Sequence, residues 1–226
     1  ANRVILVTGA NGFLGSEVVR LLVEADLPVR ATGEEPSCFH PGIEYVQADI
    51  TRPQQIIPAV TGVRTVIHTA GLAHVFRPER LAENAFRDIN ECGTANVMSI
   101  AADNGAEHFI LISSVAVYGP FTRGQCSETA PCNPEGPYAE SKFNAELRAQ
   151  DIALRSGMLL TILRFSTLYG ESDRGNVARL MQAIDRKRLL WIGDGSNRKS
   201  LLYKRDAARA CLLVDTQPAS GIRIYN

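Results

Sequence analysis

Two side chains with suitable types and spacing for proton transfer, Tyr138 and Lys142, stand at the start of an amphipathic segment. Side chains four residues apart share one face of a helix, so we expect the phenol and the ammonium group to lie close together. A tyrosine with its ordinary pKa of about 10 needs a nearby cation to act as an acid or base near neutral pH. The spacing alone is common and usually belongs to a surface pair, so the neighbouring sequence must decide.

A serine that can bind a reacting oxygen, Ser114, stands 24 residues before Tyr138. It ends the apolar run Phe109–Ser114, which is typical of a buried strand. A hydroxyl at a strand end can hydrogen-bond a reacting alcohol or carbonyl. Its alternative role is that of an ordinary turn serine.

Three glycines with the spacing GxxGxxG, Gly9, Gly12 and Gly15, follow the apolar run 4–7 and precede a helical pattern over 16–25. Glycine at a strand-to-helix turn lets backbone N–H groups approach a pyrophosphate at the helix N-terminus. The position of the triplet at the first such junction predicts a dinucleotide site rather than a merely tight turn. An oxidised nicotinamide would then add its charge to that of Lys142 beside Tyr138.

The choice of dinucleotide depends on the end of the second apolar run, where such folds carry an acid for the ribose 2′-hydroxyl. Gly33 occupies that position, and Glu34 and Glu35 follow it. Neither glutamate favours a 2′-phosphate, so we expect NAD, with NADP left open; the glutamates are otherwise solvated loop charges. Asp49, at the end of a later run, either meets the adenine side or caps the next helix.

The elements that must position these groups alternate along the chain as short apolar runs and longer amphipathic segments. This rhythm predicts an α/β fold with a doubly wound parallel sheet, a Rossmann fold. We expect a dinucleotide-binding domain over 1–165 and a smaller, incomplete substrate-binding region over 166–226. The expected strands are 4–7, 29–32, 45–47, 66–69, 109–113 and 159–165, and the expected helices include 14–25, 83–104, 138–156 and 177–187.

Composition excludes several classes of protein. The 226 residues include 24 Lys plus Arg and 24 Asp plus Glu, so the chain lacks the basic surface of a nucleic-acid or membrane binder. The five cysteines form no CxxC pair, and the four histidines lack metal-ligand spacing. The chain has no apolar stretch long enough to span a membrane. We expect a cytoplasmic protein with reduced thiols and no metal.

Taken in order, the motifs resemble those of the extended short-chain dehydrogenase/reductases, and more narrowly the NAD-dependent epimerase/dehydratase family acting on nucleotide sugars. The similarity covers essentially the whole chain. It rests on residues 8–15, 48–49, 68–71, 90–96, 113–119, 138–142 and 163–165.

The resemblance implies a role for each matching position. Catalysis falls to Ser114, Tyr138 and Lys142, with Asn90 ordering the active-site helix. Residues implied to bind the cofactor are Gly9, Gly12, Phe13, Leu14, Gly15, Glu34, Asp49, Ile50, Ala70, Gly71, Tyr138 and Lys142. Residues implied to bind the substrate are Ser114, Thr167, Asn176, Arg198 and Lys199, the last two being otherwise a solvated turn. The resemblance also implies a homodimer.

Departures from the family pattern narrow the function. Dehydratases of this kind carry an Asp-Glu pair after the catalytic serine or threonine, where this chain has Val115 and Ala116. We therefore expect a nucleotide-sugar 4-epimerase using NAD, with an NAD(P)H-dependent 4-keto-sugar reductase as the alternative. A dinucleotide-sensing regulator is a third hypothesis, disfavoured because such proteins can dispense with the tyrosine and lysine that this chain keeps.

Overall fold

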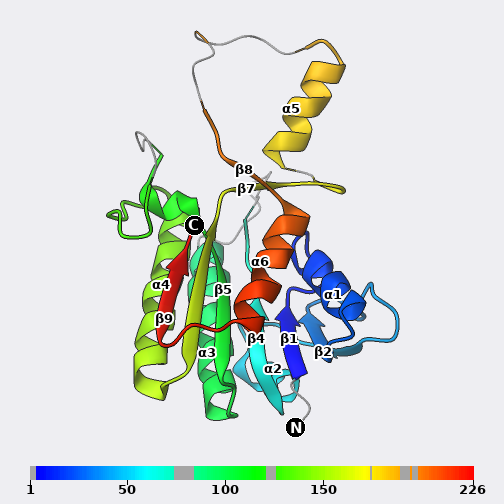
Figure 1. Ribbon diagram of the computed structural model, residues 1–226, viewed down its shortest axis with the longest axis vertical. Helices are drawn as coiled ribbons and strands as arrows, with labels where there is room; N and C mark the ends of the chain where they lie inside the picture. The colour runs from blue at the N-terminus through cyan, green and yellow to red at the C-terminus, as the bar shows by residue number, and fades with distance from the viewer. Residues whose placement is uncertain (1–3, 74–83, 121–125, 174, 189–193, 195–197) are drawn as a thin grey trace.

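The main sheet consists of parallel strands throughout (Figure 1). The computed structural model describes residues 4–73, 84–120, 126–173, 175–188, 194 and 198–226. Its strands are β1 (Val4–Thr8), β2 (Val29–Gly33), β3 (Glu44–Gln47), β4 (Val63–His68), β5 (His108–Ser114), β6 (Leu159–Phe165) and β9 (Ile222–Tyr225). They pair in the order β3-β2-β1-β4-β5-β6-β9. This order confirms the predicted doubly wound Rossmann arrangement.

Alternating side chains along the strands build a core on each face of the sheet. Leu6 of β1 packs with α2 (Pro53–Val60), α3 (Thr94–Asp103) and α4 (Pro137–Ser156). Ile5 and Val7, its neighbours on the strand, pack on the opposite face with α1 (Gly15–Glu24) and α6 (Lys204–Thr216). Because successive side chains of a strand point to opposite faces, the continuous apolar runs of the sequence supply both cores.

The helix that carries the tyrosine and lysine is closed at both ends by residues suited to those positions. Pro137 stands in the first turn of α4, where its missing N–H has no partner to lose. Gly157 follows the last turn with φ of 75°, the left-handed conformation that favours glycine at a helix C-terminus. A π-helix, η2 (Arg87–Gly93), leads directly into α3.

Residues 166–226 contribute to two parts of the molecule. A two-stranded parallel sheet of β7 (Thr167–Tyr169) and β8 (Leu201–Tyr203), with α5 (Asn176–Asp185), lies beyond the carboxyl ends of the main strands, at the top of Figure 1. The chain then returns, so that α6 packs against α1 and β9 pairs with β6. Residues 166–226, the expected substrate region, therefore also supply α6 and β9 to the main fold. No helix of the described residues is long and apolar enough to cross a membrane.

Candidate active site

Ser114, Tyr138 and Lys142 lie together at the carboxyl ends of β5 and β6. Ser114 ends β5 and begins the 3-10 helix η3 (Val115–Tyr118), and its hydroxyl accepts the backbone N–H of Ala116 at 3.1 Å. Tyr138 is half-buried in the first turn of α4, and the Ser114 side chain interacts with its phenol. Burial raises the pKa of Tyr138, and this interaction opposes that rise.

Lys142 lies one turn further along α4 and is buried. Its Nζ donates to the backbone carbonyl of Ile112 in β5 at 2.6 Å. Burial lowers the pKa of Lys142 to about 8, and the nearby Glu146 carboxylate opposes the fall. The amine therefore remains mostly protonated at neutral pH.

A buried ion pair joins α4 to β6 one turn beyond Lys142. Glu146, with none of its side chain exposed, accepts bonds from Arg164 of β6, whose Nη2 approaches Oε2 to 2.7 Å. The Arg164 Nε lies 3.1 and 3.2 Å from the two carboxylate oxygens, and the Ser113 hydroxyl donates to the same carboxylate. Arg164 Nη1 also donates to the Tyr118 hydroxyl at 2.7 Å. This network joins α4 to β5 and β6 directly beneath Lys142.

Asn90 connects the same helix to the loop after β4. Its side-chain oxygen accepts the Leu72 backbone N–H at 2.7 Å, and its Nδ2 donates to the Leu72 carbonyl and to the Ser141 hydroxyl. Ser141 in turn donates to the Tyr138 carbonyl at 2.8 Å. Asn90 sits within η2. The amide thus holds the first turn of α4 at a set distance from the loop that contains Gly71.

The glycine loop is too crowded for side chains at two of its three glycines. Gly9 has φ of 63°, and an added Cβ would lie 2.7 Å from Ala70 Cα; at Gly15 it would lie 2.1 Å from the Gly9 carbonyl oxygen. Gly12 is exposed, so its backbone is open to solvent. The loop packs against the end of β4, where the Thr69 hydroxyl donates to the Thr8 carbonyl at 2.6 Å. This backbone cradle at the start of α1 fits a dinucleotide pyrophosphate.

The loop after β2 places a carboxylate over Gly33. Both glutamates of this loop are exposed. A Cβ at Gly33 would lie 2.8 Å from Glu35 Oε2, whereas Glu34 accepts a bond from Gln47 Nε2 through its backbone carbonyl at 2.8 Å. Tyr45 donates its hydroxyl to the Glu35 carbonyl at 2.7 Å. Glu35 therefore brings its carboxylate nearer than Glu34 does to the end of β2, where Gly33 stands in place of an acid.

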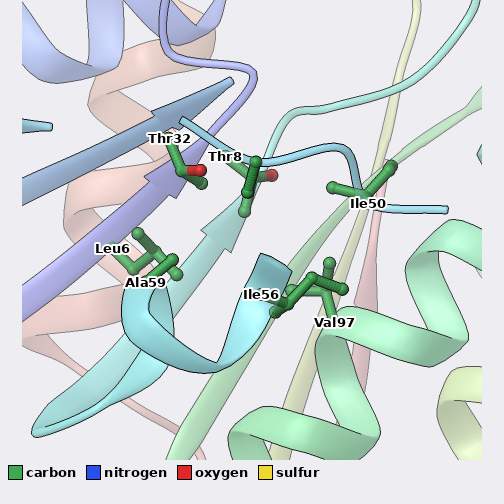
Figure 2. A pocket seen from close by; sticks show the side chains of 8 residues that line it. Leu6, Thr8, Thr32, Ile50, Ile56, Ala59 and Val97 are labelled. Atoms are coloured by element: carbon green, nitrogen blue, oxygen red, sulfur yellow. The ribbon is translucent and has the colours of Figure 1, made fainter. Parts of the chain in front are cut away.

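Asp49 and Ile50 take structural positions between β3 and α2. Asp49 accepts both the backbone N–H and the hydroxyl of Thr51 and pairs with Arg52 at 3.3 Å, so its carboxylate organises the turn before α2. Ile50 is buried beside a void of about 10 Å³, room for about one water molecule, between β1, β2, α2 and α3 (Figure 2). Their predicted contact with the cofactor stays a prediction.

The remaining predicted cofactor residues surround the glycine loop and the lysine. Leu14 is buried ahead of α1, and the Phe13 ring has the ammonium of Lys204 5.2 Å from its centre. Ala70 contacts Gly9, and a Cβ at Gly71 would stand 3.9 Å from Lys142 Nζ. The structure therefore places Gly71 between the glycine loop and α4.

A cavity of about 490 Å³ opens beside Tyr138. Its described lining is largely apolar and includes Ala73, Phe86, Ala116, Gly119, Pro120, Glu135, Gly136, Pro137, Tyr138 and Ala139. The Phe86 ring meets Tyr138 edge-on, with 6.2 Å between ring centres. Val115, which with Ala116 takes the place of the Asp-Glu pair of dehydratases, is exposed. The cavity is large enough for one sugar ring next to the phenol.

The predicted substrate residues are spread over the outlying region. Thr167 is half-buried at the start of β7, and Arg198 and Lys199 are exposed ahead of β8. Asn176 begins α5, and its side chain lies outside the described residues. Within the described residues no cluster of three His, Cys, Asp or Glu side chains is arranged to bind a metal.

Comparison with known proteins identifies the group to which this arrangement belongs. The model of the NAD dependent epimerase/dehydratase family matches residues 5–226. The chain belongs to this family. The N-acetyl-alpha-D-glucosaminyl-diphospho-ditrans,octacis-undecaprenol 4-epimerase of Escherichia coli O157:H7 is 31% identical over 98% of this chain and 66% of its own length. The UDP-glucose 4-epimerase of Vibrio cholerae is 31% identical over 88% of this chain and 62% of its own length.

Solved structures share the fold of this chain. MoeE5 in complex with UDP-glucuronic acid and NAD superposes with a TM-score of 0.87 at 27% identity, over 98% of this chain and 75% of its own. The present chain spans slightly less than two thirds of the two curated relatives and three quarters of MoeE5. The predicted family and the predicted Rossmann fold are therefore confirmed.

Two residues of the site were missed by sequence reasoning. Glu146 lies four residues after Lys142, on the same helical face, and Arg164 interrupts an otherwise apolar strand. A charge inside an apolar run is costly unless it is paired, so Arg164 was a signal that a buried acid must face it. Pairing it with Glu146 required the three-dimensional structure.

Proposed function

We propose that this member of the epimerase/dehydratase family oxidises and re-reduces C4 of a nucleotide sugar with bound NAD, as a 4-epimerase. The observation that carries the proposal is a buried Lys142 one helical turn from Tyr138, whose phenol interacts with the Ser114 side chain and lines a sugar-sized cavity. The glycine cradle and Gly71 support the presence of the cofactor on the same side of the sheet. When bound, NAD supplies a hydride acceptor and donor.

The side chains divide the remaining chemistry between them. The phenol oxygen of Tyr138 takes the proton of the C4 hydroxyl as the sugar is oxidised and returns it after the ring has turned over. Ser114 bonds the same sugar oxygen and holds it against the phenol. The protonated Lys142 lowers the energy of the phenolate through its charge. Asn90 keeps the first turn of α4, and with it Tyr138, in place.

Cofactor stoichiometry distinguishes the epimerase from a 4-keto-sugar reductase. Purified protein is mixed with candidate UDP-sugars while the absorbance of reduced cofactor is followed. The proposal predicts interconversion of C4 epimers without net change in cofactor. Continuous consumption of added NADH with a keto-sugar would refute the epimerase and support the reductase.

The role of the phenol is tested by removing its hydroxyl. Tyr138→Phe is expected to lose at least about 100-fold in turnover, the usual contribution of a positioned acid or base, while retaining NAD binding. Tyr225→Phe, at an exposed position on β9, is the matched control and should keep full activity. Full turnover by Tyr138→Phe would contradict the assignment of the phenol as acid and base.

We also propose that the protein forms a homodimer through α4 and its neighbouring helices. We further propose that it is located in the cytoplasm. Leu147 and Leu154 on α4 are 49% and 77% exposed, which supports an apolar contact on that face. Sedimentation analysis should give twice the chain mass, and Leu154→Glu should shift it toward the monomer.

A further inference from the structure

A buried histidine to which the proposed mechanism gives no role, His68, ends β4. It is 1% exposed, and both of its ring nitrogens lie next to threonine hydroxyls. Nδ1 is 2.9 Å from Thr8 Oγ1, and Nε2 is 3.0 Å from Thr94 Oγ1. Thr8 ends β1 just before the glycine loop, and Thr94 begins α3 just after the π-helix that contains Asn90. The imidazole therefore connects these two segments.

The hydroxyl of Thr94 determines which ring nitrogen carries the proton. It donates to the Asn90 backbone carbonyl at 2.6 Å, so its oxygen can only accept from the imidazole. The proton of His68 is therefore on Nε2. Burial, together with the charge of Lys142, lowers the pKa of His68 to about 3, so the ring is neutral at neutral pH. Its bare Nδ1 then accepts from the Thr8 hydroxyl.

The ends of this chain of hydrogen bonds reach both halves of the site. At one end, Thr8 Oγ1 accepts the Ala70 backbone N–H at 3.2 Å, and Ala70 packs against Gly9 of the glycine loop. At the other end, the Asn90 side chain donates to Ser141 in the first turns of α4. Each threonine hydroxyl donates once and also accepts, so removing one hydroxyl leaves a neighbour on either side without its partner.

Resting on the roles proposed above for NAD and Tyr138, we infer that His68 is a positioning residue, which ties the placement of Tyr138 to that of the glycine loop. A neutral imidazole accepts at one nitrogen and donates at the other, so it can join two hydroxyls whose bonds run in the same direction. A displacement of about 1 Å at a reacting group can cost about 100-fold in rate. Breaking the chain should therefore reduce turnover more than it reduces binding.

Removing the hydroxyl of Thr94 tests this role. Thr94→Val keeps the shape of the side chain, and its turnover at saturating NAD and sugar should fall about tenfold or more, with little change in the dissociation constant of NAD. Thr94→Ser restores the hydroxyl and should recover most of the turnover. Wild-type turnover in Thr94→Val, or no recovery in Thr94→Ser, would overturn the inference.

A second buried pair of histidine and threonine supplies the control for a merely structural effect. His108 Nε2 lies 2.9 Å from Thr161 Oγ1, and His108 stands at the amino-terminal end of β5, whereas the catalytic serine stands at the other end. Thr161→Val should lower the melting temperature about as much as Thr94→Val does but keep wild-type turnover. Equal losses of turnover in the two valine variants would show that both threonines only stabilise the fold, and would overturn the inference.

A double variant tests whether the chain of hydrogen bonds acts as a unit. Thr8→Val breaks the chain at the end next to the glycine loop. Thr8→Val combined with Thr94→Val should lose about as much turnover at saturating NAD as the more damaging single variant, because either change already interrupts the connection. If the two losses multiply, the hydroxyls act independently and the inference fails.

Nitrogen NMR of the wild-type protein, labelled in its histidines, tests the direction of the bonds without any turnover. His68 should stay neutral with its proton on Nε2 from about pH 5 to about pH 8, and His68→Gln identifies its signal. A proton on Nδ1 or a cationic ring would overturn the inference. If the tautomer and the valine variants behave as expected but the protein consumes NADH, the epimerase proposal fails and the role of His68 stands. If the protein epimerises sugars and Thr94→Val is fully active, the inference alone fails.

Discussion

The ion pair between Glu146 and Arg164 should be one of the most sensitive points of the fold. Replacing Arg164 with methionine keeps most of the side-chain volume but removes every guanidinium bond to a carboxylate that is fully buried. Only the Ser113 hydroxyl and the more distant Lys142 would remain to compensate the charge. Leaving a buried carboxylate unpaired usually costs about 3–5 kcal/mol.

This magnitude predicts a large shift in thermal unfolding. At about 2–4 °C per kcal/mol for a chain of this size, Arg164→Met should lower the melting temperature by roughly 6–20 °C. Urea denaturation followed by circular dichroism gives the free energy of unfolding. Arg155→Met, which breaks the exposed pair with Asp151, should cost less than about 1 kcal/mol and is the control.

A double variant tests the physical reason for the shift. In Glu146→Leu with Arg164→Met no buried charge remains, so the double variant should be more stable than Arg164→Met alone. If the double variant instead loses the sum of the two single losses, uncompensated charge is not the cause and the reasoning is refuted.

Two further predictions concern the glycine loop and acid stability. Gly15→Ala should weaken NAD binding and lower stability by about 1–3 kcal/mol, because its Cβ would meet the Gly9 carbonyl at 2.1 Å. Gly105→Ala meets no neighbouring atom, but φ at this position is 83°, so the variant should lose some stability and leave NAD binding unchanged in a fluorescence titration. Burial lowers the pKa of His68 to about 3 and of His108 to about 4, so the unfolded chain binds more protons below its histidine pKa of about 6.5. The free energy of unfolding should fall as pH drops from 6.5 toward 4, and His108→Gln should reduce that slope by up to about 1.4 kcal/mol per pH unit; an unchanged slope would contradict the assignment.

Strands and long helices were predictable from sequence because one hydrophobic pattern determines each of them. The runs at 4–7, 29–32 and 159–165 coincide with β1, β2 and β6 to within a residue, and the helix over 138–156 coincides with α4. The 13-residue helix α6 was missed. The helix expected after Asp49, α2, was given no bounds, because it is short and carries Pro58 inside it. Pro53, which suits a first helical turn, marks its start.

Prediction of the site was limited by contacts between distant parts of the sequence. Tyr138 and Lys142 are neighbours on one helix, so their spacing was enough to pair them. Glu35 approaches Gly33 only because the loop between β2 and β3 folds back, a path that local sequence does not determine. Arg164 and Glu146 meet only when β6 lies beside α4.

The π-helix before α3 makes the length of that segment as important as its composition. An α-helix turns by about 100° per residue, so deleting one residue between 87 and 93 would restore ordinary helical bonding and rotate Asn90 away from Leu72 and Ser141. Substitutions at exposed positions such as Arg87 and Asp88 leave that rotation unchanged. Related enzymes should therefore vary in sequence here more freely than in length, and an engineer shortening this protein should leave residues 87–93 intact.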